Sequence, residues 1–402
     1  MTLSLKKLGP GFLFAGAAIG VSHLVQSTRA GADFGFGLLW ALLLINIVKY
    51  PFFQFGPRYA SATGESLLEG YKKMGKGVLV TYFILTFATM FTIQTAVTIV
   101  TAGIASSLFG GDSMEIWAAI VTAICVIILL LGRYKILDNL MKIIVFCLTI
   151  STIIAVVMAI EPGTSLDFTQ IIPRDSISIA FLIAFMGWMP APLDISIWNS
   201  VWTVEKKKLD LSITKKQSYF DFNVGYITTT VLAIGFVSLG ALVMFGSGEQ
   251  FSSSGSIFAN QLISMYTTSL GENTKIIIGI AALATMFSTT LTTLDASPRV
   301  MKRSTELLRE RTFTRGYLFW LLILVAGTLG IFFFFISEMG LLIKIATILS
   351  FLTAPFYAII NYVLVSGKHM PSEDQPSKAM KIFSLIGIVI LIAFCLWYLS
   401  II

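Results

Sequence analysis

Long uninterrupted runs of apolar residues recur along the 402 residues of the chain, and short polar or glycine-rich segments separate them. Each run is about 20 residues or longer, which is the length that an α-helix needs to cross the hydrocarbon core of a bilayer. A membrane β-barrel would instead show short segments in which apolar and polar residues alternate. The pattern predicts an all-α integral membrane protein with eleven transmembrane helices, at 9–31, 34–57, 77–109, 113–132, 138–160, 176–202, 221–246, 274–297, 315–337, 339–366 and 380–401.

The amino-acid composition narrows the class further. Hydrophobic residues make up 56% of the chain and charged residues 12%, whereas a soluble domain carries about 25% charged residues. So few charges cannot coat a water-facing surface, and the composition also excludes a disordered or collagen-like chain. The three cysteines lie inside apolar runs without a pairing pattern, which argues against a disulfide framework or a cysteine-based zinc site.

The lysines and arginines are distributed unequally between the two sides of the predicted bundle. With a cytoplasmic N-terminus, 22 of the 28 basic residues fall in inside connections and three in outside ones. The positive-inside rule therefore predicts a multi-pass protein of the cell (plasma or inner) membrane with its N-terminus in the cytoplasm and its C-terminus outside. This topology explains the net charge of +7, so we expect the lipid bilayer and a small ion or solute as partners, and no nucleic acid.

Two of the predicted helices contain signals for a break near their middle. The first has Gly20 and Ser22 beside His23, and the sixth contains Met189-Pro190-Ala191-Pro192 followed by Asp194. Two prolines two residues apart cannot lie in a regular helix. Because the broken helices are five spans apart, the two halves would have opposite orientations, which predicts a 5+5 inverted repeat of the LeuT type with an additional eleventh helix.

The predicted repeats set the domain organisation. The first five-helix repeat spans residues 1–160, the second and inverted repeat spans 161–366, and an inside loop with helix eleven spans 367–402. Broken helices expose backbone groups at mid-bilayer, which are tolerated where they line a site or cavity. We therefore expect any substrate site between Gly20–His23 and Met189–Asp194; the alternative is a simple proline kink, which is common in spanning helices.

Several motifs resemble those of a known family. They occur in order and with matching spacing at 8–12, 29–40, 63–67, 132–135, 189–190, 293–301 and 355–356. Over essentially the whole chain, the sequence resembles the Nramp divalent-metal transporters. The resemblance implies the fold, and it implies secondary transport of a divalent metal ion.

The expected metal site differs from that of the family. Where the family's first helix breaks at Asp-Pro-Gly-Asn, this chain has Gly20-Val-Ser-His23, so the metal-binding aspartate is missing and the asparagine is a histidine. The family's Met-Pro-His in helix six is Met189-Pro190-Ala191 here, so the methionine is kept and the histidine is lost. The metal chemistry of the family is therefore largely rewritten.

The family's proton route is altered as well. The resemblance places its acidic residues in helix three on Gln94 and Val97, and Gly20 and Ala191 replace further residues of the route. Two other departures from the family are Ser196, in place of its later helix-six histidine, and Thr353, near its helix-ten glutamine. Carboxylates and imidazoles can relay protons near neutral pH, and these replacements cannot. We therefore expect weak or absent proton coupling by that route.

The candidate substrate site, by these arguments, consists of His23, Met189, Gly20, Asp194 and Thr353. Each of the three side chains with donor chemistry has a simpler explanation. His23 could hydrogen-bond a backbone carbonyl, Met189 could fill the core, and Asp194 could cap the second half of helix six. Lys49 and Lys344, deep in apolar runs, could snorkel to the interface or replace a cation in the transport cycle.

Two functions remain open, and neither is enzymatic. The first is secondary transport of a divalent metal ion, which the resemblance implies. The second keeps the scaffold and moves an organic or anionic solute, because a bare divalent ion prefers the hard negative ligand that is missing here. No nucleotide-binding or metalloprotease motif occurs, so we expect no cofactor, and family kinship favours a monomeric transport unit.

Overall fold

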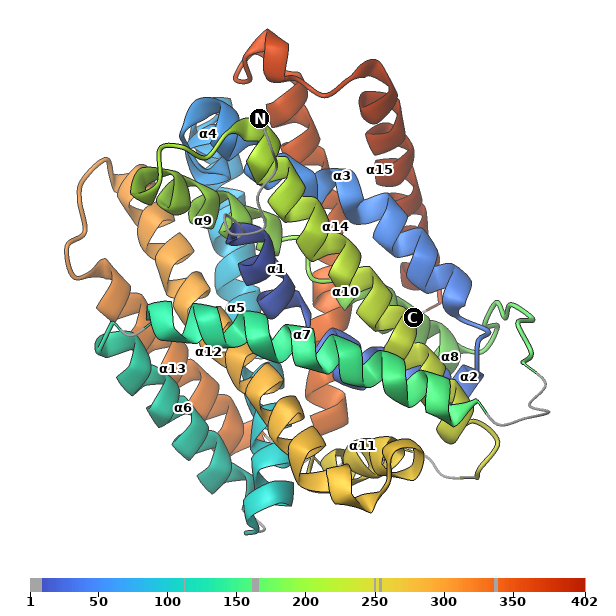
Figure 1. Ribbon diagram of the computed structural model, residues 1–402. Coiled ribbons are helices and arrows are strands. Elements are labelled where there is room, and N and C mark those ends of the chain that lie inside the picture. The colour runs from blue at the N-terminus through green and yellow to red at the C-terminus, as the bar shows by residue number, and fades with distance from the viewer. Residues whose placement is uncertain are drawn as a thin grey trace.

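The computed structural model describes residues 9–111, 113–132, 134–160, 166–248, 251–252, 255–335 and 339–401. These residues form helices and their connections, with no β-strand among them. Figure 1 shows the helices as one bundle, with α4 and the α14–α15 connection at one end and α11 at the other. The α-helices are α1 Pro10–Ala18, α2 Thr28–Phe34, α3 Leu39–Thr63, α4 Leu67–Met74, α5 Lys76–Phe109, α6 Met114–Leu130, α7 Tyr134–Ala159, α8 Ser176–Trp188, α9 Ile195–Leu209, α10 Lys215–Val243, α11 Gly255–Leu270, α12 Lys275–Arg309, α13 Gly316–Phe335, α14 Met339–Ser366 and α15 Lys378–Leu399.

The predicted runs correspond to these helices, within a few residues at most ends. The largest difference is at the C-terminal end of α12, which continues twelve residues beyond the predicted end at 297 to Arg309. The predicted end at 337 lies outside the described residues. In the described part of the chain, seven helices are long and apolar enough to cross a membrane, and three more are shorter and apolar. The chain is thus a multi-pass membrane protein, while the count of eleven spans stays a prediction.

Both helices with break signals are interrupted. The first consists of α1, a bend at Ile19–Gly20, a π-helical segment at Ser22–Ser27 and then α2. The sixth consists of α8, a non-helical segment at 189–194 and then α9. The breaks predicted from glycine and proline are confirmed.

Two helices lie outside the predicted spans. Helix α4 is a single short helix that begins with a capping box: the Ser66 hydroxyl accepts from the Leu68 backbone N–H, and the Glu69 carboxylate accepts from the Ser66 backbone N–H. Helix α11 buries one face, including Phe258, Leu262 and Tyr266, while Ile257 on another face is exposed. Its one-sided pattern is typical of a helix that lies on a surface and does not span a bilayer.

Large apolar side chains point outward as well as inward. Ile177, Phe334 and Val389 are 78%, 82% and 65% exposed. In a water-soluble protein such a belt would favour aggregation. In a bilayer the lipid chains cover it, so the exposed apolar surface agrees with a membrane protein.

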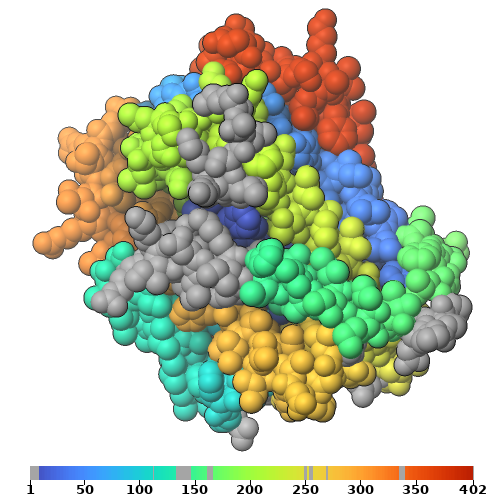
Figure 2. Space-filling view, in the orientation of Figure 1, coloured from blue at the N-terminus to red at the C-terminus, as the bar shows by residue number. Residues whose placement is uncertain are grey.

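The first half of the broken helix one packs against α10 at very short range. A Cβ on Gly11 would lie 2.0 Å from the backbone oxygen of Asp221, and one on Gly225 would lie 2.1 Å from that of Gly11. The Asp221 carboxylate also accepts hydrogen bonds from the backbone N–H groups of Gly9 (3.0 Å) and Gly11 (2.8 Å). Both N–H groups lie at the start of α1, where the helix itself offers them no backbone acceptor. A side chain of α10 therefore caps α1. Figure 2 shows α1 recessed between α10 and α7.

The second half of that helix contacts α10 in the same way. A Cβ on Gly31 of α2 would lie 2.0 Å from the Val237 oxygen, and one on Gly240 would lie 2.2 Å from the Thr28 oxygen. Small residues let membrane helices approach closely enough for backbones to touch. Both halves of helix one are therefore packed against the same helix through glycines.

Candidate functional site

The two helix breaks meet inside the bundle. The Ser22 hydroxyl of the first break lies 3.4 Å from the Pro190 carbonyl oxygen of the second. A cavity of about 20 Å³, room for roughly one water molecule, lies beside them. Its lining comes from both breaks and from α5 and α12: Ala17, Ala18, Val21, Ser22, Ile93, Val97, Trp188, Pro192, Ile195, Trp198, Thr289 and Thr293.

The free carbonyls of the first break are satisfied by neutral side chains. The Thr289 hydroxyl of α12 lies 3.1 Å from the Gly16 oxygen and 3.0 Å from the Ile19 oxygen, and the Ser22 hydroxyl donates to the Ala18 oxygen at 2.6 Å. Gly20 allows this contact, because a Cβ there would lie 2.8 Å from the Thr289 side chain. Gly20 therefore places the bend directly against α12.

His23 is fully buried, and both ring nitrogens have partners. Nε2 donates to the Thr229 carbonyl of α10 at 2.9 Å, and Nδ1 lies 2.7 Å from the Ser22 hydroxyl and 3.1 Å from the Ala18 oxygen. The imidazole thus joins the first break to α10. To ligate a metal it would have to release one of these bonds, so its role as a ligand stays a prediction.

A buried lysine satisfies the carbonyls of the second break. Lys49 of α3 has no exposed surface, and its ammonium group donates to the carbonyls of Met186 (2.8 Å), Gly187 (2.7 Å) and Ala191 (3.3 Å). The first two belong to the last turn of α8, where the helix dipole is negative. A cation therefore lies at the end of this half-helix.

Met189 and Asp194 stand at the two ends of the second break, and both are buried. Asp194 occupies the position before α9, but its side chain makes no capping hydrogen bond. Its Oδ1 atom has no hydrogen-bond partner among the residues that the structure describes. The capping explanation is therefore not supported, and a buried carboxylate oxygen is left free for a ligand.

Thr353 lies apart from the cavity lining. Its hydroxyl donates to the Leu349 and Ser350 carbonyls of its own helix, at 3.0 and 3.2 Å. Gly20, His23, Met189 and Asp194 lie at the two breaks, but they too are absent from the residues that line the cavity. Their grouping into one substrate site therefore stays a prediction.

Neutral residues occupy the positions of the family's acidic proton route. The Gln94 amide donates to the Thr98 hydroxyl at 3.1 Å and to the Thr290 carbonyl at 3.3 Å, and it accepts from the Thr293 hydroxyl at 2.7 Å. Thr101 and Thr290 share a hydrogen bond of 2.7 Å. These contacts join α5 to α12 without a carboxylate.

Sequence reasoning did not identify Thr289 as a site residue, and it left the role of Lys49 open. Thr289 lies in a stretch rich in threonine at 289–293, and Lys49 is a lone charge in an apolar run. Ten further buried polar atoms have no hydrogen-bond partner in the described part of the chain, and they are spread over several helices. Two of them, Trp198 Nε1 and Asn199 Nδ2, lie on α9.

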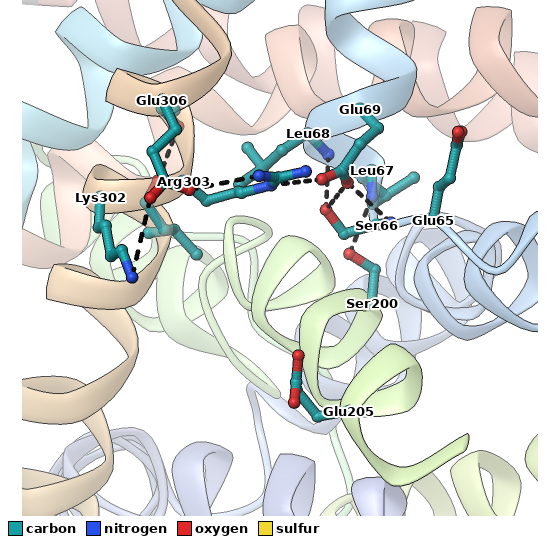
Figure 3. A network of polar contacts seen from close by, with 12 residues as sticks. Glu65, Ser66, Leu67, Leu68, Glu69, Ser200, Glu205, Lys302, Arg303 and Glu306 are labelled. Carbon is teal, nitrogen blue, oxygen red and sulfur yellow. Dashed lines mark hydrogen bonds and ion pairs between the residues drawn. The ribbon is translucent and has the colours of Figure 1, made fainter. Parts of the chain in front are cut away.

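A network of polar contacts joins α4, α9 and α12 at one end of the bundle (Figure 3). Arg303 pairs with Glu69 at 2.6 Å and with Glu306 at 3.2 Å. The Ser200 hydroxyl accepts from the Leu67 backbone N–H at 3.0 Å. A cleft bounded by Glu65, Glu69, Glu205, Lys302 and Arg303, among others, opens beside the network, so charged groups of both signs surround this cleft.

The described residues contain no group of three or more histidine, cysteine, aspartate or glutamate side chains that could hold a metal ion. The donors at the two breaks are hydroxyls, backbone carbonyls, the imidazole of His23, one thioether and one carboxylate. Such a set carries little negative charge. It can bind a cation only weakly, or it can accept a less charged ligand.

The chain matches the family model described as natural resistance-associated macrophage protein-like (Nramp) over residues 11–400. It is 36% identical to an uncharacterized protein of Pasteurella multocida (strain Pm70), over 98% of this chain and 92% of that protein.

Solved structures share the fold. A manganese transporter of Eremococcus coleocola superposes with a TM-score of 0.76 at 14% identity, covering 98% of this chain and 85% of that one. MhsT in complex with L-phenylalanine gives 0.65 at 15% identity over 96% and 98% of the two chains. Mhp1, a nucleobase-cation-symport-1 family transporter, gives 0.61 at 16% identity over 98% and 92%. The expected fold with its two broken helices is confirmed, and because the family model spans nearly the whole sequence, the chain belongs to the Nramp family of membrane transporters.

Proposed function

We propose that the protein is a secondary transporter that moves divalent metal ions across the cell membrane through the cavity between the two helix breaks. Membership of the Nramp family supports this cargo, and so does the similarity of fold to a manganese transporter. The observation that carries the proposal is the contact between the breaks, with Ser22 3.4 Å from the Pro190 carbonyl and the unpartnered Asp194 Oδ1 nearby in the second break.

The donors predict a characteristic selectivity. Hydroxyls, carbonyls and the Met189 thioether supply little charge, and Asp194 is the one carboxylate in the break segments at 19–23 and 189–194. A thioether favours softer transition metals, whereas Mg²⁺ gives up its water reluctantly. We expect weak binding overall, with Mn²⁺ and Cd²⁺ ahead of Mg²⁺ and Ca²⁺.

Uptake into proteoliposomes tests the cargo. Mn²⁺, Cd²⁺, Mg²⁺ and Ca²⁺ are compared for the wild type, Met189→Leu and Asp194→Asn, with empty liposomes as the control. The proposal expects Mn²⁺ and Cd²⁺ uptake that both substitutions reduce. Uptake of Mg²⁺ alone, unchanged in both variants, would mean that the ion keeps its water and does not contact these side chains.

A second candidate cargo is an organic or anionic solute. The cavity lining favours it, because Trp188, Trp198, Ile93 and Val97 present apolar and aromatic surface, which typically lines small-molecule sites. Calorimetry with Mn²⁺ and Cd²⁺ separates the two. No heat with either ion, together with saturable uptake of a small organic solute, would favour this candidate.

Proton coupling by the family's route should be weak or absent. Gln94 takes the place of an acidic residue and is held by neutral hydroxyls, so no carboxylate is available there to relay a proton. Proteoliposomes that enclose a pH-sensitive dye measure this directly. Acidification in step with uptake would contradict the expectation.

The remaining features of the proposal concern the whole chain. We infer a transport protein without enzymatic activity or a cofactor, working as a monomer in the plasma or inner membrane. Its repeats would span 1–160 and 161–366, with 367–402 as an addition, and the bias of basic residues places the N-terminus in the cytoplasm and the C-terminus outside. Labelling of single cysteines placed near each terminus with an impermeant reagent tests this topology.

A further inference from the structure

Carbonyl groups in the last turn of α8 accept hydrogen bonds from a cation of the protein itself, the ammonium group of Lys49. The Lys49 side chain reaches from the middle of α3, is fully buried, and donates to three carbonyls at 2.7–3.3 Å. Three convergent carbonyl oxygens, two of them at the negative end of a half-helix, form a typical site for a small monovalent cation at mid-membrane.

We propose that the second helix break is a cation-binding site whose occupant is the ammonium group of Lys49. This covalently attached charge takes the place of a bound monovalent ion. The wild-type protein therefore needs no free sodium, lithium or potassium ion to stabilise the carbonyls of this break. The inference is independent of the cargo, because none of the three carbonyls belongs to the residues that line the cavity.

Hydrogen bonding alone does not require a charge at this place. In the first break the neutral hydroxyl of Thr289 lies 3.1 and 3.0 Å from two carbonyls and donates to one of them at a time, and one turn before Lys49 the neutral amide of Asn46 donates to the Leu42 carbonyl at 2.8 Å. A buried ammonium is expensive to desolvate. Its presence here indicates that the carbonyl arrangement selects a positive charge.

Asp194 supplies a matching negative group. It lies three residues after Ala191, whose carbonyl Lys49 contacts, and its Oδ1 atom is buried without a partner in the described residues. The three carbonyls are hard oxygen donors, and the Asp194 carboxylate adds a negative charge to the same break. If the ammonium were removed, these carbonyls would suit an alkali cation.

The test removes the Lys49 ammonium group by substitution and supplies a free alkali ion. The midpoint of thermal unfolding, Tm, is measured in detergent for the wild type, Lys49→Ala and the volume-matched Lys49→Met, in sodium, lithium, potassium or choline chloride of equal ionic strength. Lys344→Ala is the control, because this lysine also lies in a spanning helix of apolar residues but is exposed. The double variant Lys49→Ala/Asp194→Asn tests the contribution of the carboxylate.

We expect the wild type and Lys344→Ala to show the same Tm in all four salts. Lys49→Ala should be less stable in choline and should regain about 2–4 °C with one of the alkali ions. Lys49→Met, whose side chain fills the space, should gain less, and the double variant should lose the response.

Three results would overturn the proposal. The first is a Lys49→Ala variant that is as stable as the wild type in choline, which would mean that the ammonium is unnecessary. The second is an equal response to alkali ions in the wild type and the variant. The third is aggregation of both Lys49 variants in every salt, because a vacated cation site should be rescued by an ion.

Discussion

The two helix breaks meet at one cavity but satisfy their free backbone groups differently. In the first break, hydroxyls of Thr289 and Ser22 and the imidazole of His23 contact the carbonyls. In the second break, the ammonium of Lys49 contacts three carbonyls, and Asp194 keeps an unpartnered oxygen. Neutral side chains thus contact the carbonyls of the first break, whereas a charged side chain contacts those of the second.

The difference lies in where the charged side chains are. In the first break the resemblance to Nramp transporters places a metal-binding aspartate at Gly20, and here that position packs against Thr289. The charged groups at the breaks are now both associated with the second. Substitutions at the two breaks test whether the first depends on neutral hydrogen bonds and the second on charge, and Gly187 has the largest expected loss of stability.

Gly187→Ala should be the most damaging change. A Cβ at this position would lie 2.2 Å from the Thr347 backbone oxygen of α14, so α8 and α14 must separate, and Lys49 would lose its geometry at the Gly187 carbonyl. Overpacking of this kind costs about 1–3 kcal/mol, and we expect the upper end of that range, measured as Tm in detergent. Gly330→Ala is the control, since nothing lies within 4 Å of a Cβ there; equal losses in the two variants would contradict the argument.

Thr289→Val should weaken the first break by a smaller amount. Valine keeps the shape but removes the hydroxyl that faces the Gly16 and Ile19 carbonyls, and buried groups left without a partner cost about 1–3 kcal/mol. Because the carbonyls stand beside a cavity that can admit one water, we expect about 1 kcal/mol. Thr289→Ser retains the hydroxyl and should keep most of the stability; a serine variant as unstable as the valine variant would point to packing instead.

Asp194→Asn should reduce transport while it leaves stability nearly unchanged. The side chain makes no capping bond, so the free energy of unfolding should change by less than about 1 kcal/mol, while uptake should fall about tenfold if the carboxylate contacts the cargo. Asp221→Asn provides the contrast, because that carboxylate accepts from Gly9 and Gly11 with its two oxygens and an amide has only one acceptor. A larger loss of Tm in Asp194→Asn than in Asp221→Asn would refute a ligand role.

Arg303→Gln should have the smallest effect on stability. Its pairs with Glu69 and Glu306 lie at a partly exposed end of the bundle, with the Arg303 side chain 46% exposed. Exposed ion pairs contribute about 0–1 kcal/mol, so Tm should fall only slightly, and the loss should shrink at high salt. A salt-independent loss would indicate that packing, and not charge, joins α4 to α12.

The helices could be predicted well from the sequence because each is an apolar run of bilayer length. Helix α11 was missed because its apolar residues occupy one face, and Ser, Thr and Asn interrupt the run. The positions of both breaks followed from glycine and proline. Their partners did not, because Lys49 lies 137 residues from Met186 and Thr289 lies 270 residues from Ile19, and a single sequence contains no signal for such pairings.

The candidate site was predicted in part for the same reason. Position in a broken helix assigned His23, Met189 and Asp194 to the two breaks, and their grouping into one site stays a prediction; position could not show that the Thr229 carbonyl already accepts from His23. Thr353 was chosen by alignment to the family, and its hydroxyl bonds within its own helix. Local pattern locates a break, whereas the orientation of a side chain depends on the helices packed around it.

The glycine contacts of α10 have a mechanical consequence. Gly11 and Gly225 hold α1 against α10, and Gly31 and Gly240 hold α2 against the same helix. A hinge at Gly20 that swung α1 alone would have to pull these backbones apart and release the Asp221 carboxylate from both N–H groups. We therefore expect the two arms of helix one and α10 to move as one rigid body during the transport cycle.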